Sequence, residues 1–571
     1  MIRTVGAMVG CAALVAGGAS VDAQAGTAAK QTIQVWLTPD LAGAERFATA
    51  VSTPGNPLYR HYLSPAEYTA RFGPSAAEAK AMADQLTARG LTDVQVSSDR
   101  SYISASGPAA KVQSLPPMAL GITGLGGASS ASAQTAQTAK PTCSQYWGQH
   151  VQTVKPAYRG LTTASLPICG YSAAQLRTAY GASPAFTGKG QTVALTESLA
   201  PTEMLKTLRE YARRNHLPAP KTNQYKEIHL GGGTGCSQQS RSAAPYNDEA
   251  EMDSEAVYAM APDAQQLMIV GGGCDEDQAL LNAVAAVLKG DGHRPSASIV
   301  SNSWQIPIGD VPPKTVHALA VRAAAEGVGL YFSSGDTPGL TTTASDPFVT
   351  AVGGTTLGLD ARNKRLFETG WSNETAIPEN GKWSGVGLTS GGGGTSLVYG
   401  QPAYQKGVVP ASMSHIRVGG RTVVDRTVPD ISAVGDIDTG MLTGYTDSES
   451  KRYVTQVNAG TSLSAPLVAG LVANAQQGRP AFGFINPLIY RLHGTPALRD
   501  VLSLPATTPQ QNRAAFTPAD GTDSASLDVF DSHDRAETDQ VTVKGYDTLT
   551  GVGTPNGLPF ILGLRVTSSL G

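Results

Sequence analysis

The sequence predicts an α/β fold, a mostly parallel sheet with helices on both faces, preceded by a smaller α+β domain. From Gly170 onward, short apolar runs alternate with segments of helical period, and repeated βα units form parallel sheets. Residues 31–116 instead combine helical segments with short alternating strands. Between the two patterns, residues 118–142 are rich in Gly, Ala, Ser, Thr and Gln and lack periodicity, which is typical of a linker.

The first domain and the second are expected to contain different elements. The strands expected in the first domain are 34–37, 94–96 and 102–104, and the helices are 41–51, 75–89 and one that opens at Ser64 and Pro65. The strands expected in the second are 191–195, 267–270, 297–301 and 328–333, and the helices are 202–215, 278–288 and 314–326. Residues 386–396, with four consecutive glycines, are expected to be a loop. Functional groups of such sheets gather beyond the carboxyl ends of the strands.

The composition and the first residues predict an exported protein. Only 15% of the 571 residues are charged, the net charge is -3, and no basic cluster suggests nucleic-acid binding. Arg3, a short apolar run and an A-x-A site predict a signal peptide at residues 1–25. A lipoprotein acceptor at Cys11 is the alternative, with a rather short apolar stretch before it. No run reaches the ~20 residues of a membrane span, so we expect a secreted, soluble monomer.

Four further cysteines predict disulfides. Exported chains form them readily, and the absence of C-x-x-C spacing argues against zinc. Three connectivities are possible; we favour Cys143–Cys169 and Cys236–Cys274 because each pair joins sequence neighbours.

Ser462 is a candidate nucleophile. It lies in residues 460–466 (GTSLSAP), between a strand-like run and an apolar helix expected over 466–476. Pro466 suits the first turn of that helix. A Ser at this junction has its hydroxyl beside free helix N–H groups, which attract an oxyanion. The alternative is an ordinary helix cap.

No histidine is placed to activate this serine. The GTSxxxP pattern also matches subtilisin-type proteases, but His493 follows the serine, and Pro496 prevents the expected helix. Asp438 imitates a subtilisin or aspartic-protease aspartate, yet it is single and no histidine separates it from Ser462. Another group must activate the serine.

Carboxylates on a predicted helix, residues 247–260, can do so. Glu249 and Asp253 are four residues apart and stack on one face. The same stripe carries Val257 and Met260, so it is expected to be buried. A solvated acidic face does not explain acids in that position.

Two other acids of this helix and one distant acid complete the candidates. Glu251 and Glu255 form a second stacked pair, which a solvated face explains well. Asp336 follows the predicted strand 328–333, where active groups collect. The alternative for Asp336 is a turn former before Thr-Pro.

In this order and spacing, Glu249-x-x-x-Asp253, residues 333–336 (SSGD) and residues 460–466 resemble the sedolisin (serine-carboxyl peptidase) family. The resemblance extends over the chain after the signal peptide, through Gln175-Leu176-Arg177-x-x-Tyr180, residues 301–304 (SNSW), 352–355 (VGGT), 428–430 (VPD) and the pro-region 58–64 (LYRHYLS). It implies a subtilisin-like sheet after an α+β, ferredoxin-like, activation domain. Gln305 departs from the family's usual Gly in a cleft-lining strand, which puts the subsite preference in doubt.

The resemblance also implies roles for the acids. Glu249 would be the general base for Ser462, Asp253 would hold Glu249, and Asp336 with the Ser462 N–H would stabilise the oxyanion. Glu249 must then be ionised while Asp336 is protonated, which predicts an acid enzyme.

A calcium ion is implied as well. The segments around Asp500 and Asp547 resemble the family's calcium loop, in which these carboxylates and the main-chain oxygens of Val501, Val543 and Gly545 would form an oxygen cage for one structural Ca²⁺. The alternative is a pair of turn aspartates. Val543 replaces a common Gly, which matters only if the backbone needs a positive φ.

We therefore expect a secreted serine-type endopeptidase made as a zymogen, which hydrolyses polypeptides and has its own pro-domain as partner. The expected order is signal peptide 1–25, activation domain 31–116, linker and processing region 117–164, and catalytic domain 165–571. A tripeptidyl-peptidase mode stays open. Two alternatives are a catalytically silent binding homologue and a subtilisin-type serine hydrolase.

Overall fold

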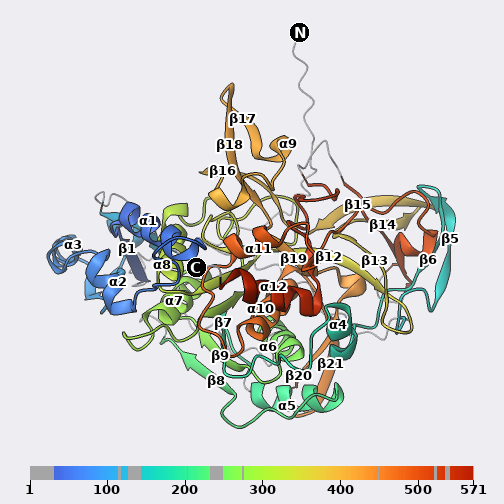
Figure 1. The fold of residues 1–571 in the computed structure, drawn as a ribbon, viewed down its shortest axis with the longest axis horizontal. Helices are drawn as coiled ribbons and strands as arrows, with labels where there is room; N and C mark the ends of the chain where they lie inside the picture. The colour runs from blue at the N-terminus through green and yellow to red at the C-terminus, as the bar shows by residue number, and fades with distance from the viewer. Residues whose placement is uncertain are drawn as a thin grey trace, which may run out of the picture.

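The computed structural model describes residues 31–112, 118–125, 143–201, 203–231, 248–272, 275–447, 449–519, 524–533 and 540–569 (Figure 1). The predicted signal peptide and the predicted pair Cys236–Cys274 lie outside these residues. Among them, no helix has both the length and the apolar character that a membrane crossing requires.

The activation domain is a four-stranded antiparallel sheet with helices. Its sheet has the order β2-β3-β1-β4, which is the ferredoxin-like order. Its elements are β1 (Gln31–Leu37), α1 (Leu41–Ser52), α2 (Pro65–Arg71), α3 (Ala76–Ala88), β2 (Thr92–Val96), β3 (Tyr102–Gly107), η1 (Ala109–Val112) and β4 (Ala119–Thr123). Capping boxes at Ser64 and Ser75 begin α2 and α3.

The second domain, called the body below, is built on a mostly parallel sheet, as predicted. Its order is β13-β12-β11-β10-β7-β9-β8, with β19 also paired to β12 and only β13 antiparallel. The strands are β7 (Thr192–Glu197), β8 (Tyr225–His229), β9 (Gln265–Val270), β10 (Ile299–Asn302), β11 (Gly329–Ser333), β12 (Thr350–Leu359), β13 (Arg365–Gly370) and β19 (Ile431–Val434).

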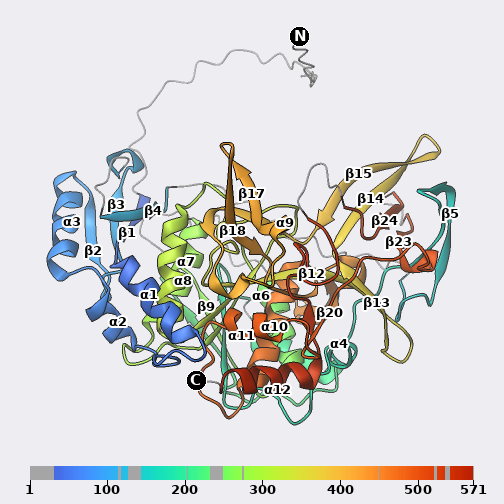
Figure 2. The same cartoon turned by 45° about the horizontal axis from the view of Figure 1, so that its top comes forward.

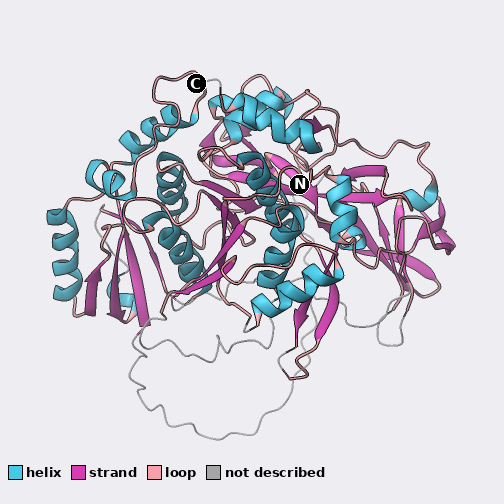
Figure 3. Ribbon diagram, turned by 60° about the horizontal axis from the view of Figure 1, so that its bottom comes forward, coloured by secondary structure: helices cyan, strands magenta, loops and turns pink. Residues whose placement is uncertain are grey.

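Helices cover both faces of this sheet (Figure 3). One face packs on α7 (Glu276–Lys289) and α8 (Pro313–Ala325). The other packs on α4 (Ala173–Ala179), α5 (Met204–Arg214), α6 (Asp248–Met260), α10 (Thr461–Gln476), α11 (Asn486–Leu492) and α12 (Gly557–Thr567). The activation domain lies against α7 and α8, where Trp36 and Leu120 join the core of the body (Figures 1 and 2).

Smaller sheets surround the main one. At the end opposite the activation domain, a six-stranded sheet of order β15-β14-β24-β23-β6-β5 contains β5 (Val151–Tyr158), β6 (Leu161–Ser165), β14 (Ser372–Glu379), β15 (Lys382–Ser390), β23 (Ala514–Thr517) and β24 (Ser526–Val529) (Figure 2). The others are formed by β16 (Gly394–Gly400), β17 (His415–Val418) and β18 (Arg421–Val428), by β20 (Met441–Thr446) and β21 (Tyr453–Asn458), and by β22 (Leu498–Arg499) and β25 (Thr554–Pro555). Short helical turns are η3 (Ala403–Gln405), α9 (Ala411–Ser414), η4 (Ile437–Thr439) and η5 (Gln510–Asn512).

Two predicted segments are more ordered than expected. The linker assigned to 117–164 contains β4, because Leu120 and Thr123 are buried against β1, and it contains β5 and most of β6, which pair with each other. The loop expected over 386–396 shrinks to residues 391–393 between β15 and β16, since β15 pairs along its length with β14.

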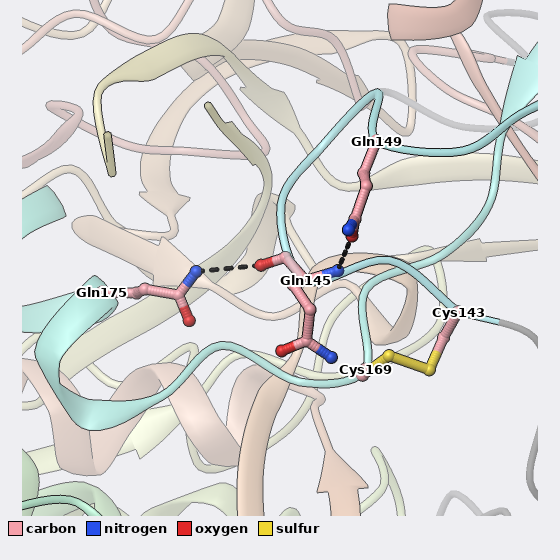
Figure 4. Close-up of a disulfide and its surroundings, with 5 residues drawn as sticks. All are labelled: Cys143, Gln145, Gln149, Cys169 and Gln175. Carbon is pink, nitrogen blue, oxygen red and sulfur yellow. Dashed lines mark hydrogen bonds between the residues drawn. A yellow bond between two sulfur atoms is a disulfide. The ribbon is translucent and has the colours of Figure 1, made fainter. Parts of the chain in front are cut away.

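Cys143 and Cys169 form a disulfide where the described chain resumes after residue 142 (Figure 4). Gln175 donates from Nε2 to the Gln145 carbonyl oxygen at 3.0 Å, and the Gln149 side chain accepts from the Gln145 N–H at 2.6 Å. These contacts anchor the start of the body to the first turn of α4.

Candidate functional site

Ser462 lies in the first turn of α10, which begins at Thr461 rather than at Pro466 as predicted. Pro466 is therefore inside the helix, where its missing N–H leaves the Ser462 carbonyl oxygen without the usual helical donor. The Ser303 hydroxyl takes that place at 2.9 Å. The Ser462 hydroxyl in turn donates to the Ser303 carbonyl oxygen at 3.3 Å, so the residue after β10 and the first turn of α10 fix each other.

Asp336 lies beside the same helix end. Its Oδ1 accepts hydrogen bonds from Thr461 N at 2.7 Å and from Thr461 Oγ1 at 2.8 Å. A Cβ on Gly460 would lie 2.7 Å from Asp336 Oδ2, and Gly460 has φ +89° and ψ 166°, a combination open essentially to glycine alone. The chain can thus bring the second oxygen of this carboxyl close to the turn that carries Ser462.

Glu249 and Asp253 come from α6, which covers residues 248–260 as predicted. This helix packs on α10, and Asn474 donates from Nδ2 to the Met260 carbonyl oxygen at 2.9 Å. Asp253 is fully buried, and its Oδ1 lies 2.8 Å from the Ser303 hydroxyl oxygen. Glu249 is one turn earlier and lies close enough to the Ser462 side chain for that group to lower its pKa.

A third carboxyl of the site was missed by the sequence analysis. Glu197 is the last residue of β7, 4% exposed, and hydrogen-bonded to Asp253. The available signal was an acid at the carboxyl end of a buried strand, the criterion that selected Asp336. Three acids from two elements therefore line up behind Ser462.

The electrostatics favour protonated carboxyls in this group. Burial, and after it the Asp253 charge, raises the pKa of Glu249 well above its ordinary value, while Ser462 partly lowers it. Burial raises the pKa of Asp253 to about 8, against hydrogen bonds from Ser303 and Glu197. Burial and the charges of Asp253 and Glu249 raise the pKa of Glu197 well above its usual range.

Asp336 also retains its proton more strongly than an exposed aspartate. Burial raises its pKa, and the two hydrogen bonds from Thr461 only partly offset this. A protonated Oδ2 would be a neutral donor beside the helix N-terminus.

Glu251 and Glu255 are not on a solvated face, as the sequence suggested, but buried. The hairpin of β20 and β21 covers this side of α6. Glu255 Oε2 accepts from Gly444 N at 2.9 Å, and Oε1 accepts from the Tyr453 hydroxyl at 3.0 Å. Glu255 thus attaches to α6 the hairpin that leads to Ser462.

His493 and Asp438, whose sequence motifs imitate those of other proteases, lie outside this site. His493 Nε2 approaches Gly545, at 3.9 Å from a Cβ placed there. Asp438 is buried within η4, and burial, then the charge of Asp528, raises its pKa well above the ordinary value. Within the described ranges, Ser462 has no hydrogen bond to a histidine.

The predicted calcium loop comes together in part. Asp500 accepts from Gly545 N, at 3.0 Å through Oδ1 and 3.1 Å through Oδ2. Asp547 Oδ1 accepts from Thr550 N at 2.7 Å, and Oδ2 accepts from Val543 N at 3.2 Å. Val543 is not among the residues with positive φ, so a side chain costs nothing there, whereas Gly545 has φ +84°.

This donor set fits a hard cation. Asp547 is fully buried, which raises its pKa to about 7, and the groups that lower it again are N–H donors and a hydroxyl, not basic side chains. A cation would therefore stabilise its ionised form. Nowhere in the described residues do three or more His, Cys, Asp or Glu side chains group to hold a metal. Coordination here would need main-chain oxygens such as those of Val501, Val543 and Gly545.

Comparisons with known proteins agree with the fold. The Subtilase family matches residues 219–512, and the family described as "Pro-kumamolisin, activation domain" matches residues 18–158. Kumamolisin from Bacillus sp. (strain MN-32) is 31% identical over 339 residues, 56% of this chain but only 55% of the relative. Sedolisin from Pseudomonas sp. (strain 101) is 26% identical over 500 residues, 80% of this chain and 78% of the relative.

A tripeptidyl-peptidase and a solved structure are also similar. Tripeptidyl-peptidase 1 from Homo sapiens is 30% identical over 200 residues, 31% of each chain. The structure of Pseudomonas sedolisin complexed with pseudo-iodotyrostatin matches with TM-score 0.50 and 23% identity, over 70% of this chain and 99% of that one. The predicted fold class is thereby confirmed.

The buried carboxyls predict that stability falls as the pH rises. A carboxyl with a raised folded-state pKa stabilises the fold below its unfolded pKa, and this contribution is lost as the pH passes the folded value. Those values are about 8 for Asp253 and about 7 for Asp528 and Glu326. In an inactive Ser462→Ala background, the unfolding free energy should decrease between pH 4 and 8, by up to about 1.4 kcal/mol per unit of pKa shift for each group.

Denaturant titration at several pH values measures this effect. Asp253→Asn keeps a neutral group and should flatten the decline, whereas the exposed Asp84→Asn should leave it unchanged. A background protein that is more stable at pH 8 than at pH 4 would contradict the prediction.

Proposed function

This chain belongs to the sedolisin family of the subtilases, a family of serine-type peptidases with an activation pro-domain, and on that basis we propose that it is a secreted, acid-acting endopeptidase. The observation that carries the proposal is the arrangement of Ser462 at a helix N-terminus with Glu249 and Asp336 on either side and no histidine. Its substrates are polypeptides.

Acylation uses Ser462 as nucleophile. Its Oγ attacks the carbonyl carbon of the scissile bond while the Glu249 carboxylate takes the hydroxyl proton. The oxyanion accepts hydrogen bonds from the Ser462 N–H and from protonated Asp336. The C–N bond then breaks, and Glu249 passes its proton to the leaving amine. A water molecule then attacks the acyl ester. Glu249 again takes a proton and passes it on, this time to Ser462 Oγ as the ester bond breaks, and Asp336 again donates to the oxyanion.

The proton count explains the acid range. Three buried carboxyls cannot all be ionised at acceptable cost, and burial raises the pKa of Glu197, Asp253 and Glu249 alike. Activity requires a negative charge on Glu249 while Glu197 and Asp253 stay protonated. It also requires the proton on Asp336, which alkaline conditions remove.

The activation domain is held on the body by ionic contacts. His317 of α8 lies 3.0 Å from Glu45 of the activation domain and 2.7 Å from Asp346 of the body. Burial lowers the pKa of His317, but the two carboxylates outweigh it and raise the pKa to about 9. Arg322 pairs with Asp99 of the activation domain at 2.6 Å. We infer that this docked form is a zymogen and that cleavage before the peptidase body activates it.

Secretion through residues 1–25, one structural calcium ion and a monomeric state are parts of the same proposal. Calcium would be held by Asp500, Asp547 and main-chain oxygens of Val501, Val543 and Gly545, and would stabilise the C-terminal loop without entering the reaction. The tripeptidyl-peptidases among the relatives make removal of tripeptides the second candidate activity.

Ser462→Ala should abolish peptide hydrolysis and self-maturation, because it removes the hydroxyl that the proposed mechanism uses as nucleophile. The purified variant should keep residues 31–116, as mass spectrometry of the intact chain will show. Processing at the wild-type rate, with host proteases excluded, would rule out autocatalysis.

The pH profile should be bell-shaped and centred in the acid range. Its ascending limb follows the ionisation of the three carboxyls Glu197, Asp253 and Glu249. Its descending limb follows the loss of the Asp336 proton. Asp336→Asn should lose activity but flatten the descending limb, whereas Asp336→Ala should lose about 10²–10³ in kcat. Glu249→Gln should be nearly inactive at every pH.

Steady-state kcat/KM between pH 2 and 8 tests these changes. Glu251→Gln is the matched control, since Glu251 is a buried acid of α6 outside the proposed catalytic group. An optimum above pH 7, or near-normal activity of Glu249→Gln, would refute the mechanism.

Calcium should stabilise the protein by about 2.7 kcal/mol at a hundredfold excess over Kd. In the Ser462→Ala background, a chelator should lower Tm, and Asp500→Asn should remove that response while Asp84→Asn keeps it. A Tm that does not respond to chelator in the background protein would exclude the site.

A further inference from the structure

An open pocket lies where α1 of the activation domain meets the body. Its volume is about 420 Å³, enough for a small organic molecule. Thr49 and Ser52 of α1, with the turn that follows them, form one wall. The opposite wall consists of body residues within 347–348, 402–408 and 484–491. The pocket therefore exists only while the activation domain is docked.

The body side of the pocket presents aromatic rings. Phe484 stands edge-on to Tyr404 with ring centroids 5.7 Å apart, and the Tyr490 ring lies 5.0 Å from that of Tyr404. The hydroxyls of both tyrosines are used elsewhere. Tyr404 donates to the Pro347 carbonyl oxygen at 2.8 Å, and Tyr490 donates to Asp430 Oδ1 at 2.9 Å. The tyrosines thus offer their rings to the pocket, which suits an aromatic or alkyl ligand.

The charges around the pocket are positive. Lys406 and Arg491 line it, and no Asp or Glu is among its described lining residues. Arg491 Nη2 donates to the Pro54 carbonyl oxygen at 3.1 Å, across the boundary between the two domains. Lys406 is exposed and forms no ion pair with the part of the chain that the structure describes. Two cations beside an apolar wall favour an anionic ligand.

Ser52 adds a hydrogen-bond donor from the activation domain. The residue is 3% exposed, and its hydroxyl oxygen has no hydrogen-bond partner within the described ranges. An unpaired buried hydroxyl is costly, and this one can donate to an oxygen atom of a ligand in the pocket. A ligand that pairs with Ser52 contacts both domains at once.

We propose that this pocket binds a small amphiphilic anion, with an aromatic or alkyl body and one carboxylate or sulfonate group, and that the bound anion holds the activation domain on the body. The apolar part lies against the rings of Tyr404, Phe484 and Tyr490. The anionic group lies near Lys406 and Arg491. Because both domains form the pocket, the anion binds the docked form alone and stabilises it by mass action. Binding is independent of the proposed peptidase function, and only its consequence, retention of the zymogen, rests on that function.

Anilinonaphthalene sulfonate is a direct probe, because it is an aromatic anion whose fluorescence rises in apolar surroundings. One molecule should bind to each full-length Ser462→Ala chain at about pH 5. Thr49→Trp fills the pocket from an exposed position of α1 and should weaken binding at least about tenfold. Lys406→Gln should weaken it about threefold, whereas uncharged phenylnaphthylamine should bind Lys406→Gln and its parent equally. Lys382→Gln on β15, at the far end of the molecule, is the matched control and should change neither affinity (Figure 2).

Hydrogen exchange in the same Ser462→Ala protein measures the effect on docking. Amides of α1 that exchange only when the activation domain leaves the body should slow by the factor 1 + [L]/Kd, about elevenfold at a probe concentration of ten times Kd. Amides of β15 should keep their exchange rates. In Thr49→Trp, the probe should no longer slow the exchange of α1.

The inference is wrong if the probe does not bind to the Ser462→Ala protein, if Thr49→Trp binds it as tightly as its parent, or if saturating probe leaves the exchange of α1 unchanged. An equal loss of affinity for both probes in Lys406→Gln would overturn the choice of an anion. Melting curves identify a variant that does not fold, and Val408→Trp, which fills the pocket from the body side, then replaces Thr49→Trp. Since all these proteins lack the Ser462 hydroxyl, failure of the peptidase function would not alter the results.

Discussion

Burial of carboxyl groups at one end of a parallel sheet is the constraint on which the site depends. Glu197 ends β7, Asp253 and Glu249 follow on α6, and their charges would be costly away from water. The protein lowers this cost by retaining protons. In the proposed mechanism, Glu249 acts as a base only when its neighbouring carboxyls are neutral, and Asp336 must keep its own proton. Acid conditions meet both requirements. On the proposed mechanism, activity in acid and stability in acid have one physical origin.

The geometry around that group depends on an unusual helix. Because Pro466 has no N–H, Ser462 offers its carbonyl oxygen to Ser303, whose hydroxyl also contacts Asp253. One hydroxyl thus connects the proposed nucleophile with the residue proposed to support its base. Because Ser303, the residue after β10, contacts both α6 and α10, a larger or apolar residue there would disturb two helices at once.

Local patterns in the sequence predicted most of this arrangement. Glu249 and Asp253 were recognisable because a carboxyl pair at helical spacing shared a stripe with Val257, and Asp336 because it follows a buried strand. The burial of Glu255 was not predictable, since its partners come from the β20–β21 hairpin nearly two hundred positions later. The start of α10 was misplaced because a proline usually marks the first turn, and Glu197 resembled an ordinary strand end.

Gly460 matters for the proposed reaction and not for the hydrophobic core. Any side chain there would push against Asp336 Oδ2, but the hydrophobic core of the body does not involve this position. A single codon change at this position would therefore disturb the proposed site first. The strain of a side chain at this φ and ψ falls on the turn before α10, not on the packing of the core. Loss of activity and loss of the hydrophobic core are thus expected to separate at this one residue.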